Sequence, residues 1–314
     1  MIALKNSTRS GHRRHLICLA LAGLVFAALS IAATAGDDVA KPVGLTKEFI
    51  RFVKTGRTEG HVDTATKSYS RASDQVQVSL VAVVHVGDGA YFDGLQKMFT
   101  SYDAVLYEMI RDRETEPTAE VGTDHPVSQL QIGMKTLLEL EFQLDRIDYS
   151  KPNFVHADLD PTTFASLQAE RGESIFGLLF KASLEEQRKQ ATDPNAGLNP
   201  FSVLFALASD DRGHQLKFLL GQQMWQMEDM LAGINQTADG KGSAILSGRN
   251  EHAMKVLAEQ IEKGRKKLAI FYGAGHMPDF EKRLLEQGFK QVGEAWQTAW
   301  DIRRKDKGTT GSKD

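Results

Sequence analysis

The chain has 314 residues, 41% hydrophobic and 25% charged, with a formal net charge of −3. This composition is typical of a globular protein with one large domain or two small ones. It lacks the basic excess of a nucleic-acid-binding protein, and its single cysteine, Cys18, excludes a scaffold held by disulfides.

The first 35 residues have the pattern of a secretory signal peptide. Basic residues precede an apolar stretch over 16–32, and Ala33-Thr34-Ala35 places small residues where signal peptidase reads them. We therefore expect an exported protein, periplasmic or secreted, with no membrane span once the signal is removed. An uncleaved N-terminal anchor is the alternative, because 16–35 could just cross a bilayer. Cleavage would remove Cys18 and leave no thiol nucleophile.

The next segments predict the first half of a sheet. Residues 50–70 are mixed and polar, which indicates an edge strand or two. Residues 76–86 alternate and then become continuously apolar, which predicts a strand covered on both faces, with His85 near its end. After a glycine-rich break, 91–99 predicts a helix and 104–109 a second strand with Glu108 near its end.

The middle of the chain predicts mainly helices. Helical spacing recurs over 127–147, and a third short strand is expected at 154–157. We expect a helical insert over about 160–240. Its expected parts are two helices over 162–189 broken near Gly172, a linker at 193–200, a helix over 201–231 and a turn at 240–242.

The last third repeats the earlier order. We expect a helix over 253–262 capped by Gly264, a strand at 267–272, a tight glycine loop, a helix over 279–287 ended by Gly288, and a strand at 289–299. Strand, glycine loop, helix and strand thus occur twice. The sequence predicts an α/β fold with a central mixed sheet built from two related strand-loop-helix halves. A single domain would span 36–300, followed by a disordered polar tail over 301–314.

Two histidines occupy equivalent places in these halves. His276 ends Gly273-Ala274-Gly275-His276, where the glycines allow a sharp turn and a close approach of a ligand or metal. His85 ends an apolar strand and lies two residues before Gly87. Either imidazole could bind a cation or act as a general base, or could be an exposed or core histidine without a function. Ligands bind at the carboxyl edge of such sheets, so we expect both histidines in one site.

Charged residues near the strand ends extend this candidate site. Glu108 ends an apolar run, and a buried carboxylate there needs a cation or a metal ion as partner. Arg249 could pair with Glu108, could hold a substrate carboxylate or a developing oxyanion, or could form a surface ion pair. Asn250 could act in the site or merely cap a helix. His156 and Asp158 could be two more metal ligands, but a solvated histidine and an N-capping aspartate are slightly favoured.

Two tyrosines, Tyr91 and Tyr272, adjoin the histidines in sequence and could supply an acidic hydroxyl. This expectation rests on adjacency alone.

Four of these motifs together resemble an ordered family signature. They are Val84-His85-Val86-Gly87, Leu106-Tyr107-Glu108, Arg249-Asn250 and Gly273-Ala274-Gly275-His276. Over about 75–300 they resemble the Tiki/TraB/GumN family. One departure concerns the first motif. In the family this motif starts with a glycine, and this chain has Ala82 three residues before His85, which puts the geometry and activity of the site in question.

The resemblance implies a hydrolase whose two histidines and glutamate face one cleft. Tiki members are regarded as proteases that depend on a divalent metal, so His85, Glu108 and His276 would hold Zn²⁺, Mn²⁺ or Co²⁺ and activate a bound water. The substrate would be a peptide or a small molecule.

Two alternatives remain open. One is a metal-free hydrolase with a histidine base, as in distant erythromycin-esterase-like relatives. The other is a non-catalytic protein that binds a ligand or peptide. The absence of an H-E-x-x-H motif excludes a zincin mechanism.

Overall fold

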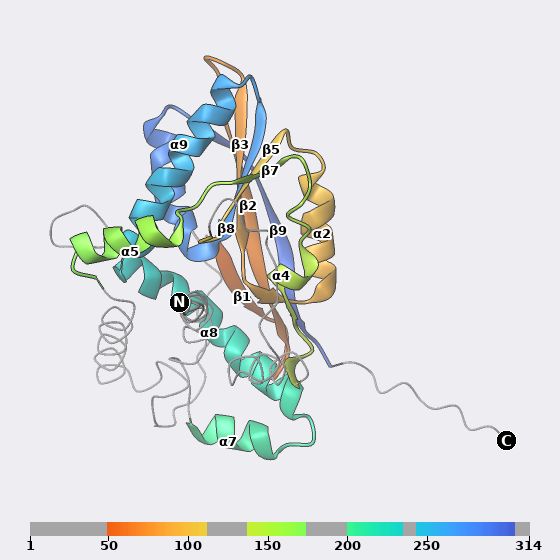
Figure 1. The fold of residues 1–314 in the computed structure, drawn as a ribbon. Coiled ribbons are helices and arrows are strands. Elements are labelled where there is room, and N and C mark those ends of the chain that lie inside the picture. The colour runs from red at the N-terminus through yellow and green to blue at the C-terminus, as the bar shows by residue number, and fades with distance from the viewer. Residues whose placement is uncertain (1–48, 112–136, 174–199, 235–242, 305–314) are drawn as a thin grey trace, which may run out of the picture.

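A seven-stranded mixed sheet forms the centre of the protein (Figure 1). The computed structural model describes residues 49–111, 137–173, 200–234 and 243–304. The strand order is β1-β2-β3-β8-β5-β7, with β9 paired to β2. This confirms the α/β fold with a central mixed sheet. The predicted signal at 1–35 and most of the polar tail lie outside the described residues.

Four strands form the parallel part of the sheet. They are β3 (Val76–Val83), β8 (Lys267–Gly273), β5 (Ala104–Tyr107) and β7 (Phe154–His156). The three inner strands consist largely of Val, Leu, Ile and Ala, and nearly all of their residues are buried, as expected where both faces are covered. Although β8 is the last of these four strands in sequence, it lies between β3 and β5. Because the strands are parallel, their carboxyl ends share one edge of the sheet.

The antiparallel part of the sheet is built around β2 (Gly60–Arg71). One side of β2 pairs with β1 (Ile50–Lys54) and then with β3, and the other side pairs with β9 (Lys290–Ile302). The prediction of edge strands over 50–70 therefore holds for β1 but is wrong for β2. The polar side chains of β2 hid its position, since buried pairs such as Thr64 Oγ1 and the Tyr91 hydroxyl satisfy them at 2.9 Å.

Helices cover the sheet. Helix α2 (Gly89–Phe99) and helix α9 (Arg249–Glu262) lie on opposite sides of it (Figure 1). Helix α10 (Met277–Glu286) follows β8 and buries Phe280 and Leu284. The chain reverses after α9 at Gly264 and after α10 at Gly288, with φ of 86° and 82°. Glycine adopts this left-handed backbone most readily, so the two predicted helix ends are confirmed.

A small two-stranded sheet lies where the sequence predicted the end of the strand over 76–86 and a part of the helix over 127–147. The strand predicted over 76–86 ends at Val83, and β4 (Val86–Gly87) turns away to pair with β6 (Glu141–Phe142). The continuous helix predicted over 127–147 is interrupted in its described part. Residues 137–138 are helical, β6 follows, and the short helix α4 (Gln143–Arg146) comes next. Glu139 has a φ of 55°, a left-handed conformation that a helix cannot accommodate.

The expected helical insert separates the two halves. Its described helices are α5 (Pro161–Glu170), α7 (Pro200–Ala208) and α8 (Arg212–Ile234), and α8 lies beside the lower part of the sheet in Figure 1. The single helix predicted over 201–231 is thus interrupted at 209–211. The linker predicted at 193–200 and the turn at 240–242 lie almost wholly outside the described residues. Within the described ranges, no helix has both the length and the apolar character needed to cross a bilayer.

Candidate functional site

Glu108 is the centre of a buried polar cluster at the carboxyl edge of the parallel strands. It directly follows β5, and its side chain is only 9% exposed. Its Oε1 accepts a hydrogen bond from Arg249 Nη2 at 2.8 Å, and its Oε2 accepts one from the Gly273 amide at 2.7 Å. Both carboxylate oxygens therefore have strong donors, which is what a buried carboxylate requires.

Arg249 bridges two buried carboxylates. Besides Glu108, it contacts Asp158, with Nε to Oδ1 at 2.9 Å and Nη2 to Oδ2 at 2.5 Å. The predicted pairing of Arg249 with Glu108 is confirmed, and it is a buried rather than a surface ion pair. The expectation that Asp158 caps a helix is wrong, because Asp160 is the N-cap of α5 and accepts from the amides of Thr162 and Thr163.

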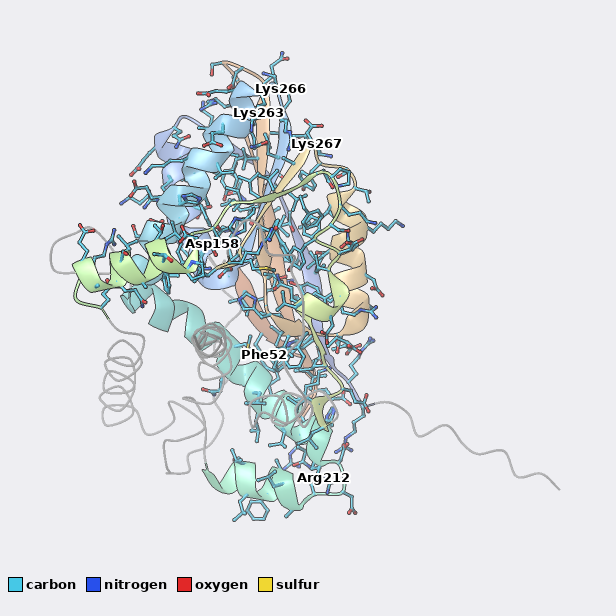
Figure 2. All side chains as sticks on the ribbon, viewed as in Figure 1. Phe52, Asp158, Arg212, Lys263, Lys266 and Lys267 are labelled. Carbon is cyan, nitrogen blue, oxygen red and sulfur yellow. The ribbon has the colours of Figure 1, made fainter. Side chains whose placement is uncertain are left out.

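Local packing fixes the position of Arg249. It is the first residue of α9 and directly follows a π-helical turn at Ala244–Gly248, a feature common at functional sites. A Cβ on Gly248 would lie 2.4 Å from Leu167 Cδ2, so glycine lets α5 approach this turn closely. Asp158 lies between α5 and the sheet, away from Lys266 and Lys267 at the other end of β8 (Figure 2).

The hydrogen bonds of His276 determine its tautomer. Its Nδ1 lies 2.6 Å from Asn250 Oδ1, while Asn250 Nδ2 donates to the His276 carbonyl at 3.1 Å and to Asp279 Oδ2 at 2.8 Å. Because both of these partners only accept, the amide oxygen must face the imidazole, and Nδ1 carries the proton. The bare Nε2 then lies 3.4 Å from Arg249 Nη1 and 3.5 Å from Glu108 Oε1.

His85 joins the cluster from the other half of the sheet. Like His276, it has Nδ1 against a side-chain amide oxygen and Nε2 toward the cluster. Its Nδ1 donates to Gln143 Oε1 at 2.8 Å, and Gln143 Nε2 donates to the Tyr149 hydroxyl at 2.7 Å. The bare Nε2 points to Gly273, where a Cβ would lie 3.2 Å from it and 3.3 Å from Glu108 Oε2. Gly273 thus leaves open the space between the imidazole and the carboxylate. Gly275 lies in the following turn, Ala274–His276.

Electrostatics keep this cluster in one charge state at neutral pH. Burial would raise the pKa of Glu108, but Arg249, the two histidines and the Gly273 amide outweigh it and hold that pKa well below its usual range. Burial would also lower the pKa of Arg249, but Asp158 and Glu108 raise it above its ordinary value. Burial lowers the pKa of His276 to about 4, against the opposing charge of Glu108. His276 is therefore neutral beside an ionised carboxylate and a charged guanidinium.

Three other predicted residues take no part in the hydrogen bonds of this cluster, although the ring of Tyr272 packs on that of His276 with centroids 5.3 Å apart. The His156 Nε2 donates to the Met109 carbonyl at 2.6 Å, and its ring packs on Tyr107. The Tyr91 hydroxyl bonds Thr64 and the Ala82 carbonyl, and the Tyr272 hydroxyl donates to the Ala157 carbonyl at 2.6 Å. Burial raises the pKa of both tyrosines, so neither is the acidic hydroxyl that adjacency suggested.

Ala82 fits the sheet without distortion. It is 1% exposed and pairs in register with Tyr272 inside the parallel ladder of β3 and β8. A regular strand position has no special need for glycine, so the replacement of the family's glycine leaves the path of β3 intact.

Sequence reasoning missed the groups that orient the two histidines. Gln143 and Tyr149 hold His85, and Asp279 holds the Asn250 amide that faces His276. Gln143 lies 58 residues from His85 and sits in a segment whose spacing predicted a continuous helix. No local signal marked it. Of the two roles expected for Asn250, a part in the site and a helix cap, the structure supports the first, since its Oδ1 contacts His276 Nδ1.

The predicted metal site does not fit this arrangement. Within the part of the chain that the structure describes, no group of three or more His, Cys, Asp or Glu side chains is placed to hold a metal ion. Arg249 explains this, because its guanidinium contacts Glu108 Oε1 and approaches His276 Nε2, where an ion would have to bind. Binding of Zn²⁺, Mn²⁺ or Co²⁺ stays a prediction that requires Arg249 to move.

Comparisons of the chain with models of known families, with curated proteins and with solved structures find no match. The resemblance to the Tiki/TraB/GumN signature therefore rests on the four motifs alone.

The free energy of unfolding is expected to fall as the pH drops from 6.5 to about 4, because His276 changes its pKa between these values on folding. In this window the unfolded chain binds more protons than the folded one, so stability rises with pH and this contribution levels off above about pH 7. The shift corresponds to about 3 kcal/mol. Urea unfolding of the wild type and of His276→Gln with EDTA present measures the difference. Parallel pH curves for the two proteins would contradict the buried neutral state.

Proposed function

We propose that the protein is a hydrolase that cleaves a peptide or ester bond with His85 as a general base and without a metal ion. One observation carries this proposal. Arg249 already supplies the positive charge that Glu108 needs, while His85 presents a proton-free Nε2 toward the same carboxylate. A neutral imidazole held by its Nδ1–H is the form that can accept a proton.

In this reaction a water molecule attacks the substrate carbonyl carbon and gives a proton to His85 Nε2. The bond from the carbonyl carbon to the leaving oxygen or nitrogen then breaks, and the His85 imidazolium returns the proton to the leaving group. The Gln143 amide oxygen accepts from Nδ1 throughout and so keeps the ring in place. His85 is partly exposed, as a residue that takes a proton from water requires.

Arg249 is suited to stabilise the negative charge that develops on the carbonyl oxygen. Asp158 and Glu108 accept from Nε and Nη2, whereas the contact of Nη1 among the described residues is the long one of 3.4 Å with His276. A fixed donor with a full positive charge, held among buried groups, costs little reorganisation during the reaction. His276, with a pKa near 4, is neutral at pH 7 and cannot act as a general acid there; it orients Nη1.

A metal-dependent hydrolase is the second candidate. The bare Nε2 atoms of His85 and His276 both lie beside Glu108, and their Nδ1 protons are held by side-chain amides, as expected of metal-binding imidazoles. The two candidates differ in the partner of Glu108.

Glu108→Gln separates the candidates. If Arg249 is the partner, this variant should lose about 3 kcal/mol of unfolding free energy, because a buried cation loses one of its two carboxylates. Its metal content should equal that of the wild type. If a metal is the partner, the variant should lose the metal and keep its stability. Urea unfolding and elemental analysis of both proteins give the two readouts. A wild type that binds one divalent ion and loses it in Glu108→Gln would contradict our proposal.

Activity is tested on the wild type with a panel of p-nitrophenyl esters and fluorogenic peptides, with and without EDTA. Hydrolysis that survives EDTA supports the proposal, and hydrolysis that returns only with Zn²⁺, Mn²⁺ or Co²⁺ supports the second candidate. A protein that binds a ligand from the panel without cleaving it would match the non-catalytic alternative.

We also propose export, which depends on residues outside the described ranges. N-terminal sequencing that finds Gly36 first would support it.

A further inference from the structure

We propose that Gln143 is a positioning residue that holds His85 in the tautomer with a bare Nε2. Its catalytic consequence rests on the proposed function, whereas the tautomer itself can be measured without any activity. The inference comes from three features of the structure: the attachment of Gln143 to His85, the groups that hold the Gln143 side chain, and the equivalent arrangement at His276.

The backbone joins Gln143 to His85. The backbone N–H of Gln143 donates to the His85 carbonyl at 2.9 Å. Val86, which follows His85, pairs with Phe142, which precedes Gln143, in the ladder between β4 and β6. The side chain adds the bond from His85 Nδ1 to Oε1 at 2.8 Å. Backbone and side-chain hydrogen bonds therefore both hold Gln143 against His85, and the pairing of β4 with β6 brings the two residues together.

Buried aromatic residues hold the Gln143 side chain. Gln143 is 5% exposed, and its Nε2 donates to the hydroxyl of Tyr149, which is 8% exposed. The Tyr149 ring packs against Tyr107 and Phe154, with centroids 4.9 Å and 5.7 Å away. In this orientation of the amide, Nε2 faces the Tyr149 hydroxyl and the carbonyl oxygen faces the imidazole.

This choice of side chain has a chemical consequence. In free histidine the neutral imidazole prefers the proton on Nε2, which here would place the proton toward Glu108 and remove the base. An acceptor on Nδ1 reverses that preference. A carboxylate would do the same but would add a third negative charge to a cluster that already contains Glu108 and Asp158. The amide of Gln143 selects the tautomer without adding charge.

The second half of the sheet repeats the arrangement. Asn250 Oδ1 accepts from His276 Nδ1 at 2.6 Å, and its amide group is held by two acceptors. Both histidines thus receive their Nδ1 acceptor from a side-chain amide whose nitrogen is bonded elsewhere. Gln143 and Asn250 lie on different elements, α4 and α9, so the similarity does not follow from one shared structural segment.

The test is the tautomer of His85, read from its ¹⁵N chemical shifts at about pH 9, where imidazoles are neutral even beside a carboxylate. Comparison with His85→Gln assigns the resonances. The wild type should show the Nδ1–H form and Gln143→Met the Nε2–H form, while Gln143→Glu keeps an acceptor and should retain Nδ1–H. Gln96→Met is the matched control, because Gln96 bonds the Asp148 amide at an exposed position.

Activity gives the second readout. Gln143→Met should lower kcat by about 10- to 100-fold with little change in KM, as expected for a residue that orients a reacting group. Gln143→Glu should recover much of kcat, and Gln96→Met should behave as the wild type. An Nε2–H wild type, or a Gln143→Met variant that stays folded and keeps Nδ1–H, overturns the inference. A correct tautomer in a protein that hydrolyses nothing would overturn the proposed function alone.

Discussion

Replacing Arg249 with methionine is expected to lower the free energy of unfolding by about 3–5 kcal/mol, the largest stability change of any single substitution in the cluster. Arg249 is 7% exposed and is the shared partner of Glu108 and Asp158. Its removal leaves two carboxylates buried without the cation that keeps the pKa of Glu108 below its usual range. Urea unfolding followed by circular dichroism measures the change.

Arg146→Met is the matched control. Arg146 pairs with Asp93 at 2.6 Å, but the two side chains are 35% and 61% exposed, so the loss should be about 0–1 kcal/mol. The double variant Arg249→Met with Asp158→Asn should be more stable than Arg249→Met alone, because one of the two unpaired charges is gone. Equal losses in Arg249→Met and Arg146→Met would show that the buried cluster does not depend on the arginine.

Replacing His85 with alanine is expected to reduce kcat by about 10²- to 10⁴-fold, the range for removal of a general base. Its fold should remain stable, since His85 is partly exposed and, among the described residues, its side chain loses the one Nδ1 hydrogen bond to Gln143. The rate is measured on whichever ester or peptide the wild type cleaves, with EDTA present throughout. The Gln143 carbonyl then lacks one donor, which costs far less than the catalytic effect.

His61→Ala is the control for this measurement. His61 lies on β2, its side chain is 30% exposed, and it contacts Asp63 rather than the cluster. It should keep the wild-type rate. His276→Gln should lose less kcat than His85→Ala, because His276 acts through Arg249. A loss of kcat in His276→Gln that exceeds the loss in His85→Ala would assign the base to the other half of the sheet.

The sequence was sufficient to predict the inner strands and the helix ends. Continuous runs of Val, Leu, Ile and Ala are typical of strands that are buried on both faces. The bounds of β3, β5 and β8 could therefore be predicted from the sequence to within a few residues. Gly264 and Gly288 marked the ends of α9 and α10, because their left-handed backbone disfavours other residues. The apolar pattern could not place β2, whose buried residues include Asp63, Thr64 and Lys67.

The sequence by itself also determined that His85, Glu108 and Gly273 follow apolar strands, which places each at a carboxyl end of a sheet strand. Only the tertiary structure decided that they meet. Strand β8 inserts between β3 and β5, and this brings Gly273 between the imidazole and the carboxylate. Local periodicity specifies which face of an element is buried but carries no information about which strand becomes its neighbour.

The same limit applies to the charges. Glu108 needed a positive partner on physical grounds, and the sequence offered both a metal ion and Arg249. The choice depends on the position of a guanidinium that is 141 residues from Glu108 and 91 from Asp158 along the chain. A hydrogen bond depends on a separation of about 3 Å in space, and such separations between distant residues exist only once the sheet has assembled. The tertiary structure therefore decided that Arg249 contacts Glu108.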